Sequence, residues 1–159
     1  VEYCLMQRQG SIQQMQLAPT YEEPVAEVTE FLRGLLAACN QAGIGADRLY
    51  LDPGNEVRKT LELHHELSGR LAELRSLGLP LLLGVSRKSF IEHVRSAQGL
   101  GESASPASDR LGGTAAAISF CVRAGAKVLR VHDVAVMAEA AAVAHALSAV
   151  DSPRPEPRD

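Results

Sequence analysis

The fold is decided by the stretch Leu81-Leu82-Leu83-Gly84-Val85-Ser86-Arg87-Lys88-Ser89-Phe90. A short apolar run leads into Gly84, and two hydroxyls, a guanidinium and an ammonium group follow. This pattern predicts a buried strand that opens into a polar turn and then a helix. Ser86 or Ser89 is the candidate N-cap of that helix. Its first turn offers backbone N–H groups beside Arg87 and Lys88, which suits an anionic or electron-rich ligand.

The order of an apolar strand followed by a helix occurs four times in the chain. The predicted strands are 2–6, 49–51, 79–83 and 127–131, and helical spacing follows at 24–41, 61–77, 109–123 and 133–150, with a flexible loop at 98–108. Units of about 30 to 45 residues are typical of parallel sheets, so we expect an α/β fold of parallel βα units. The chain is long enough for one domain, at 1–150, and the Pro-rich tail 151–159 is expected to be disordered.

The first predicted helix shows one buried apolar face, formed by Val25, Val28, Phe31, Leu32, Leu35, Leu36 and Cys39, and Ala42-Gly43 ends it. The three cysteines, Cys4, Cys39 and Cys121, lie far apart in apolar or helical surroundings. We therefore expect reduced, partly buried thiols in a cytoplasmic protein.

The composition excludes several kinds of partner. The formal net charge is −3, and both signs are scattered along the chain, so neither nucleic acid nor an anionic membrane surface is an expected partner. No apolar run reaches the roughly 18 residues of a membrane span, and no Cys/His spacing resembles a zinc site. The start at Val1, directly in a predicted strand, indicates a segment of something longer.

Polar side chains follow each predicted strand. These are 7–9 after the first strand, Asp52 after the second, 86–89 after the third and 130–133 at the fourth. In a small open parallel sheet, and equally in half of an eight-unit barrel, ligands collect at the carboxyl ends of the strands. The four clusters therefore predict one site on this rim.

The last cluster, Leu129-Arg130-Val131-His132-Asp133, predicts an anion site. Side chains alternate along a strand, so Arg130 and His132 share one face and suit an oxyanion such as phosphate. In the alternative interpretation, Arg130 pairs with Asp133 or another carboxylate, and His132 is a core histidine whose ring nitrogens are hydrogen-bonded within the protein. Asp133 is expected to be the N-cap of the last helix.

Asp52 and Lys88 each allow two interpretations. Asp52 precedes Pro53-Gly54, which forces a turn, so its carboxylate either accepts two N–H groups from a guanidine-like ring edge or only bonds nearby backbone. Lys88 either donates to a ring carbonyl or ring nitrogen or is a solvated surface lysine. Arg87 is expected to be an ion-pair partner.

Some polar motifs are expected to be structural. His64-His65 and His93 lie in helical, charged surroundings and are interpreted as surface residues. Gly112-Gly113 near a helix start indicates close packing or backbone approach, because the spacing matches no P-loop.

Taken together, the motifs resemble the C-terminal half of the dihydropteroate synthases, in the pterin-binding TIM-barrel family. The matching pieces occur in that family's order and spacing: Cys4-Leu5-Met6 with Gln9-Gly10, Leu51-Asp52-Pro53-Gly54 with Lys59-Thr60-Leu61, Gly84 to Ile91, Arg110 to Thr114, and Arg130-Val131-His132-Asp133. The resemblance implies a fold that is the C-terminal half of a (βα)8 TIM barrel.

The resemblance also implies a function in folate biosynthesis. It implies a cytoplasmic, homodimeric transferase that condenses 4-aminobenzoate with hydroxymethyl-dihydropterin diphosphate, releases diphosphate, and is a sulfonamide target. By resemblance, Asp52 and Lys88 hold the pterin, Ser89 lies by the aminobenzoate carboxylate, and Arg130 and His132 hold the diphosphate. The implied catalytic residues are Lys88, Arg130 and His132. Mg²⁺ is implied as a cofactor, with its ligand in the N-terminal half, so no residue of this chain is assigned to a metal.

Three departures from the family pattern leave other functions open. The family's His-Met-Gln-Gly is here Gln7-Arg8-Gln9-Gly10, its Phe-Gly-Phe-Gly is Asn55-Glu56-Val57-Arg58, and its later His-Asn pair is Leu63-His64. The alternatives are a non-catalytic paralogue or truncated fragment that acts by binding or association, and a corrinoid-linked methyltransferase. The isolated segment is expected to be inactive. A half barrel exposes strand edges and an apolar face, so the segment is also expected to aggregate, pair with another copy, or need its missing half.

Overall fold

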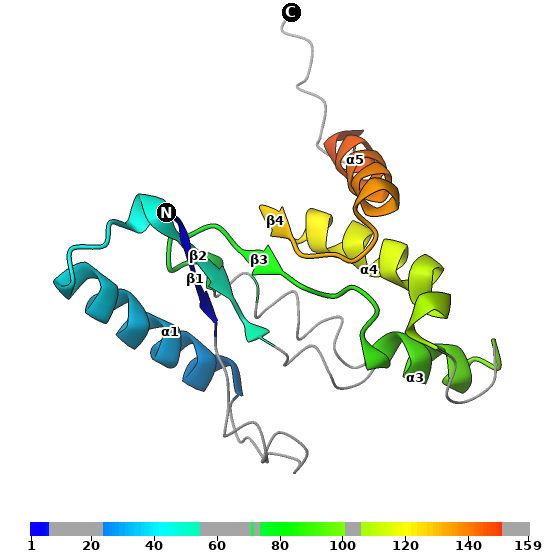
Figure 1. The fold of residues 1–159 in the computed structure, drawn as a ribbon, viewed down its shortest axis with the longest axis horizontal. Coiled ribbons are helices and arrows are strands. Elements are labelled where there is room, and N and C mark those ends of the chain that lie inside the picture. The colour runs from blue at the N-terminus through cyan, green and yellow to red at the C-terminus, as the bar shows by residue number, and fades with distance from the viewer. Residues whose placement is uncertain (7–23, 55–70, 72–73, 101–105, 151–159) are drawn as a thin grey trace, which may run out of the picture. The chain divides into compact units, whose positions relative to one another are not determined.

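The computed structural model describes residues 1–6, 24–54, 71, 74–100 and 106–150 (Figure 1). The chain divides into two compact units, Val1–Gly84 and Val85–Asp159. The predictions for the polar cluster at 7–9, for most of the helix at 61–77, for His64-His65 and for the tail at 151–159 lie outside the described residues. None of the described helices is long and apolar enough to cross a lipid bilayer.

The first unit is built on parallel strands. Strand β1 (Tyr3–Met6) pairs in parallel with β2 (Leu49–Asp52), and Asp52 stands opposite Met6 at the carboxyl end of both. A parallel bridge joins Leu51 to Leu81, just before β3 (Leu82–Leu83). Helix α1 (Pro24–Gln41) and the short 3₁₀ helix η1 (Ala46–Arg48) connect β1 to β2. The parallel order predicted for these strands is confirmed.

The core of the first unit is formed by leucines of the strands and of α1, each at most 3 % exposed: Leu32, Leu49, Leu51, Leu81 and Leu83. The prediction for Phe31 was wrong, since it is 44 % exposed. An α-helix turns by about 100° per residue, so Phe31 lies outside the arc that runs from Leu35 to Leu36 through Leu32. The helix ends as predicted: Gly43 has φ +76°, and the Ile44 N–H donates to the Cys39 carbonyl at 2.9 Å.

Cys4 was predicted to be partly buried and is exposed. Among the described residues, β1 pairs with β2 alone, so its other edge and much of its surface are uncovered. Tyr3 and Met6 on the same strand are exposed for the same reason. Cys39 is half-buried and Cys121 is buried, and all three are free thiols.

The second unit is mainly helical. It contains α3 (Ser89–Ala97), the 3₁₀ helix η3 (Ala107–Arg110), α4 (Leu111–Arg123), β4 (Val128–Leu129) and α5 (Val134–Val150). Helices α4 and α5 pack together. The buried side chains of this unit include Ile91, Ile118, Cys121, Met137 and Ala144.

A close approach between α3 and α4 explains one of the paired glycines. A Cβ atom on Gly113 would lie 2.2 Å from Cγ2 of the buried Ile91, whereas a Cβ on Gly112 would meet nothing within 4 Å. The predicted packing role is therefore confirmed for Gly113 only. The predicted loop 98–108 is too long, because Ala107 and Ser108 already belong to η3.

The third and fourth strands are shorter than predicted. Instead of 79–83 and 127–131, the structure has Leu82–Leu83 and Val128–Leu129. Gly78, with φ +76°, precedes the predicted third strand, and Pro80 within that strand has no backbone N–H to donate to a neighbouring strand. After Leu129 the chain leaves the strand, and the backbone N–H of His132 donates to Ser86 Oγ at 3.3 Å.

Candidate functional site

Asp52 is a buried carboxylate at the end of β2. It is 3 % exposed, and its Oδ1 accepts the Gly54 N–H at 2.8 Å, while Gly54 adopts φ +79°. This contact is the one expected of an aspartate before Pro-Gly in a turn. The contact fixes the orientation of the Asp52 side chain at the carboxyl end of the strand.

In the second unit, the backbone of Arg87 is held in an unusual conformation. Arg87 has φ +57°, the only positive φ at a non-glycine residue in the described part of the chain. Its N–H donates to Thr114 Oγ1 at 3.1 Å, and its carbonyl accepts from Arg110 Nη1 at 2.9 Å. Arg110 also pairs with Glu92 of α3. Such a conformation persists only where its surroundings enforce it, and here bonds on both sides of the residue do so.

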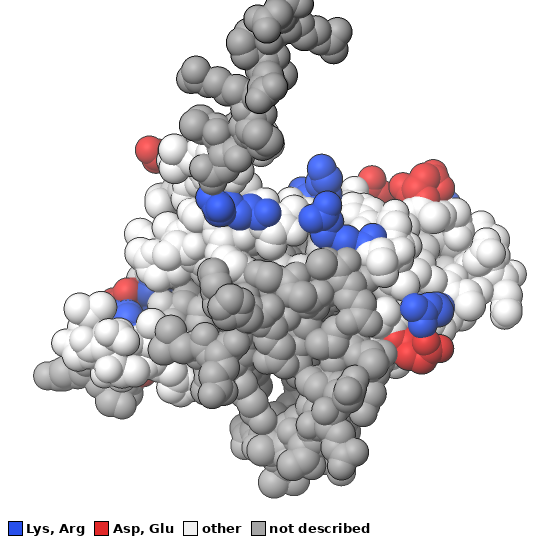
Figure 2. All heavy atoms as spheres, turned by 180° about the vertical axis from the view of Figure 1, so that it is seen from behind, with Lys and Arg blue, Asp and Glu red and all other residues white. Residues whose placement is uncertain are grey.

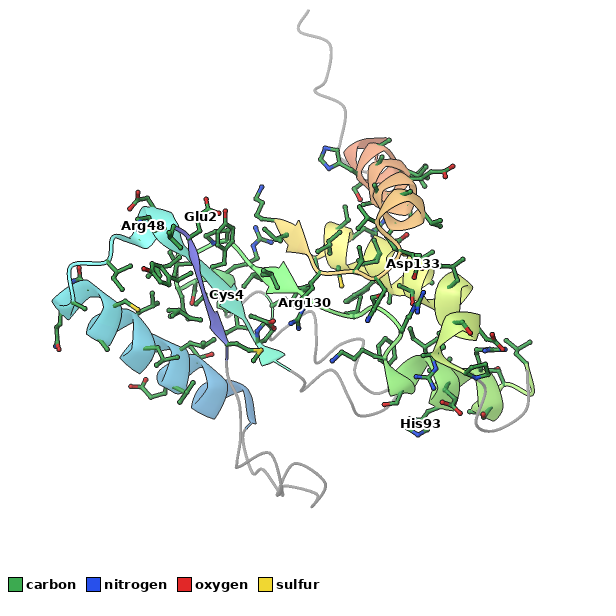
Figure 3. All side chains as sticks on the ribbon, viewed as in Figure 1. Glu2, Cys4, Arg48, His93, Arg130 and Asp133 are labelled. Atoms are coloured by element: carbon green, nitrogen blue, oxygen red, sulfur yellow. The ribbon has the colours of Figure 1, made fainter. Side chains whose placement is uncertain are left out.

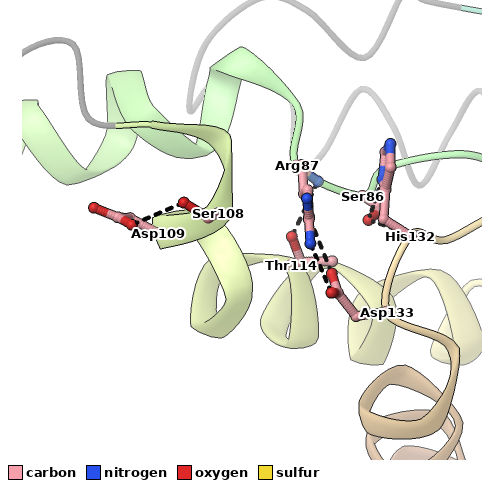
Figure 4. A network of polar contacts seen from close by, with 7 residues as sticks. All are labelled: Ser86, Arg87, Ser108, Asp109, Thr114, His132 and Asp133. Atoms are coloured by element: carbon pink, nitrogen blue, oxygen red, sulfur yellow. Dashed lines mark hydrogen bonds and ion pairs between the residues drawn. The ribbon is translucent and has the colours of Figure 1, made fainter.

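The Arg87 side chain forms an ion pair with Asp133 (Figure 4). Nε lies 3.1 Å from Oδ2 and Nη2 lies 2.7 Å from Oδ1, a two-point contact between a guanidinium and a carboxylate. The hydrogen bond from Arg87 lowers the pKa of Asp133, with a smaller lowering by the charge of Arg87, and raises the pKa of Arg87. The ion-pair role predicted for Arg87 is confirmed.

Ser86 is bound to His132, the residue before Asp133. Its Oγ accepts the backbone N–H of His132 at 3.3 Å and lies 2.9 Å from the ring Nδ1 of the same histidine (Figure 4). Ser86 itself is 5 % exposed. The prediction that Ser86 or Ser89 caps α3 was wrong, because Lys88 is the N-cap and makes no side-chain capping bond, while Ser89 is the first helical residue.

The remaining predicted site residues lie at the ends of these elements. Lys88 and Ser89 are half-buried at the start of α3. Arg130 is exposed directly after β4, and His132 is exposed just before α5. The alternative of a core histidine is therefore wrong for His132. Both oxygens of the Asp133 carboxylate bind Arg87. Asp133 immediately precedes α5, the position predicted for the N-cap of that helix, and its backbone carbonyl accepts the Met137 N–H at 3.0 Å.

Thr114 and Arg110 were not predicted as part of this network. Thr114 is fully buried in α4, one and two turns before the apolar Ile118 and Cys121. A hydroxyl placed within an apolar helical face is a sequence signal for a buried hydrogen bond, because a buried polar group needs a partner. That the partner is Arg87 follows only from the structure.

His93, the candidate surface histidine within the described residues, lies outside this network. His93 is exposed on α3 and points away from it (Figure 3), which confirms its surface position. Acidic and basic side chains lie in small groups among neutral residues on the face drawn in Figure 2. Within the described ranges, no group of three or more His, Cys, Asp or Glu residues could hold a metal ion.

The fold and the site together define an α/β protein of parallel βα units with polar side chains at the carboxyl ends of its strands. A family model described as pterin binding enzyme matches residues 1–132. This chain belongs to the pterin-binding enzyme family.

The relatives agree with this assignment. The chain is 40 % identical over 154 residues to a dihydropteroate synthase of Escherichia coli, covering 96 % of this chain and 52 % of the relative. It also matches the dihydropteroate synthase of Yersinia pestis in a sulfonamide drug complex, with a TM-score of 0.80 and 32 % identity over 95 % of this chain and 52 % of that one. The enzyme of Xanthomonas albilineans in complex with 7,8-dihydropteroate matches with a TM-score of 0.73 and 34 % identity, over 97 % and 52 %.

The chain thus spans about half the length of the relatives it matches. Its fold is that of half of a (βα)8 barrel, and the fold class predicted from the sequence is confirmed.

Proposed function

We propose that this chain forms half of a dihydropteroate synthase, a transferase that joins 4-aminobenzoate to hydroxymethyl-dihydropterin diphosphate and releases diphosphate. The observation that carries the proposal is the bonded network in the second unit. It ties residues 86 and 87, beside Lys88 and Ser89, to residues 132 and 133, beside Arg130. These are the two motifs by which the sequence most resembles the synthases.

In the proposed reaction the amino nitrogen of 4-aminobenzoate attacks the methylene carbon of the pterin substrate. A C–N bond forms while the C–O bond to the diphosphate breaks, and the diphosphate leaves with the electron pair. The nitrogen then loses a proton to solvent. Negative charge grows on the departing diphosphate, so donors placed at its oxygens lower the barrier.

Arg130 and His132 are the proposed donors to the diphosphate. Both are exposed, and they lie between the end of β4 and the start of α5. A guanidinium offers N–H groups in a fixed planar arrangement, which suits phosphate oxygens. An imidazole N–H adds a second, differently directed donor.

Lys88 and Asp52 are proposed to hold the pterin. The ammonium group of Lys88, at the N-terminus of α3, donates to a ring carbonyl or ring nitrogen. The Asp52 carboxylate, fixed by the Gly54 N–H, accepts from the guanidine-like edge of the ring. Ser89, the first residue of α3, is proposed to donate to the aminobenzoate carboxylate, with backbone N–H groups of the helix start beside it.

Mg²⁺ is proposed as a cofactor of the complete protein. Its ligand is proposed to lie in the part of the relatives that this chain does not match. Within the described ranges, no cluster of three or more acidic, His or Cys side chains could hold a cation.

The test is turnover by the protein expressed from the complete coding sequence that contains this chain. Dihydropteroate and diphosphate should form together from the two substrates, in equal amounts. The control is His93→Ala, which removes an exposed imidazole that points away from α3 and should leave the rate unchanged. Binding of both substrates without turnover would overturn the enzyme proposal in favour of a non-catalytic paralogue.

The 159 residues alone are proposed to be inactive and to associate. Helix α5 exposes Val136, Val143 and Leu147 by 46 %, 54 % and 61 %, an apolar surface that favours association. A cytoplasmic homodimer is our proposal for the complete protein. Light scattering on an eluting size-exclusion peak tests it, and a monomer at micromolar concentration would contradict it.

A further inference from the structure

In the second unit, the consecutive residues Ser86 and Arg87 bind the consecutive residues His132 and Asp133. Ser86 binds His132, and Arg87 binds Asp133 (Figure 4). We propose that Ser86 and Arg87 are positioning residues that fix the His132 ring as a neutral donor, with its proton on Nε2. The identity of the anion that accepts the hydrogen bond from Nε2–H rests on the proposed function. The arrangement of the ring does not rest on it.

Ser86 makes two contacts to one histidine from a single oxygen. The oxygen accepts the His132 backbone N–H and also lies 2.9 Å from Nδ1. A hydroxyl has one proton and its oxygen already accepts one N–H, so in the proposed arrangement the proton is donated to Nδ1, which makes that nitrogen the acceptor. In a neutral imidazole the other nitrogen then carries the proton. Because Ser86 is 5 % exposed, water has little access to replace its hydroxyl in this bond.

Arg87 fixes the backbone that follows the ring. Its guanidinium binds both oxygens of Asp133, the residue between His132 and the first turn of α5. The left-handed backbone of Arg87 is itself fixed by Thr114 and Arg110, so this contact is anchored in the buried face of α4. The loop that carries His132 is therefore held at two consecutive residues.

The carboxylate next to His132 in the sequence is engaged by the same network. Asp133 is the nearest carboxylate in the sequence, and both of its oxygens face Arg87. Nδ1 lies 2.9 Å from Oγ of the buried Ser86, and His132 as a residue is exposed, so we place Nε2 on the exposed side of the ring. The arrangement thus presents one N–H donor outward and no acceptor nitrogen, which suits an oxyanion and disfavours a cation.

The primary test reads the tautomer of His132 directly. Long-range ¹H–¹⁵N spectra of the complete protein, labelled with ¹⁵N-histidine, distinguish protonated Nε2 from protonated Nδ1 at a pH where the ring is neutral. The His132→Gln variant identifies the signal. We expect Nε2–H in the wild-type protein. An Nδ1–H ring, or an even mixture of the two forms, would overturn the proposal without requiring any variant to fold.

Matched variants separate positioning from a merely structural role. Ser86→Ala should shift His132 to a mixture of tautomers, and Ser86→Thr, which keeps the hydroxyl, should restore the wild-type signal. Arg87→Lys keeps one donor to Asp133, so it should retain more of the wild-type Nε2–H signal of His132 than Arg87→Ala does. An unchanged His132 signal in Ser86→Ala would contradict the role of Ser86.

Kinetics distinguish failure of this proposal from failure of the proposed function. If the protein turns over, Ser86→Ala should lower kcat by up to about 100-fold, because a small displacement of a donor has an effect of that size, while KM for 4-aminobenzoate stays within twofold. Wild-type protein without turnover but with the Nε2–H tautomer would contradict the function and leave the positioning intact. Turnover with equal kcat in both proteins would contradict the positioning alone.

Discussion

The guanidinium of Arg87 meets both carboxylate oxygens of Asp133, at 3.1 and 2.7 Å, across a sequence separation of 46 residues. The contact joins the turn before α3 to the turn before α5. Side chains of both residues are partly exposed, at 31 % and 25 %, so the pair acts through its two-point geometry more than through burial.

This pair should make the protein less stable in acid. The pKa of Asp133 is lowered from its ordinary value of 3.8 by Arg87, so the folded protein binds this proton less readily than the unfolded chain. Its contribution to the free energy of unfolding is therefore complete above that ordinary value and is lost as the pH falls through the lowered pKa.

Urea unfolding at several pH values checks this prediction. Asp133→Asn should be less stable than wild type at pH 7, and the difference should shrink as the pH falls below about 4. Glu139→Gln, which removes an exposed carboxylate from the same helix, is the control and should show a smaller difference at pH 7. A difference for Asp133→Asn that stays constant down to pH 2 would show that the ion pair contributes nothing.

Lys88→Ala should weaken binding of the pterin substrate by about 2 kcal/mol, since a hydrogen bond from a charged donor is lost. Affinity for 4-aminobenzoate should change little. Isothermal titration with each ligand measures both values. Lys127→Ala, at the amino end of β4, removes an equal charge away from the predicted rim and serves as the control. Unchanged pterin affinity in Lys88→Ala would remove this residue from the site.

Arg130→Ala should reduce turnover much more than it reduces binding of 4-aminobenzoate. Loss of one donor to growing negative charge lowers kcat by a factor on the order of 10² to 10³. Steady-state kinetics with both substrates varied gives the two parameters separately. Arg123→Ala, in the last turn of α4, also removes a guanidinium and serves as the control, with a smaller loss of turnover expected. A loss confined to aminobenzoate affinity would contradict the assignment of Arg130 to the diphosphate.

Gly113→Ala should destabilise the protein by about 1 to 3 kcal/mol, because the new methyl group overlaps Ile91 Cγ2. Gly112→Ala, in the same turn but facing open space, should be neutral or stabilising by up to about 1 kcal/mol. Chemical denaturation measures both. Adding Ile91→Leu, which removes the branched methyl at Cγ2, should recover part of the loss in Gly113→Ala. Equal stability of the two glycine variants would refute the close approach.

Cys121 should resist alkylation in the folded protein. Burial raises its pKa to about 12, and the thiolate is the reactive form, so little of it reacts at pH 8. Cys4, exposed on β1, should react first. Mass spectrometry of peptides after brief maleimide treatment compares the two, and unfolding in guanidinium should make them equal. Modification of Cys121 at the rate of Cys4 in native protein would show that α4 opens readily.

Much of the fold could be predicted because apolar spacing reports which face of an element is buried. The parallel order of β1 and β2, the end of α1 at Gly43 and the span of α5 all follow from local pattern. Phe31 was placed wrongly because it lies at the margin of the apolar arc of α1, where small differences in packing decide exposure. The lengths of the third and fourth strands were wrong because apolar spacing reports burial and not backbone pairing, and the structure limits these strands to Leu82–Leu83 and Val128–Leu129.

The sequence by itself determined where the residues proposed for the site lie along the chain. Each of them follows a strand or starts a helix, and such positions are set by local propensity: Asp52, Lys88, Ser89, Arg130 and His132. Only the tertiary structure decided how they are held. That Ser86 binds His132, that Arg87 takes Asp133, and that Thr114 and Arg110 fix Arg87 in a left-handed backbone depend on contacts between residues 23 to 46 positions apart. A hydrogen bond requires its two atoms within about 3 Å, and that distance is set by how the helices pack, which residue spacing along the chain does not specify.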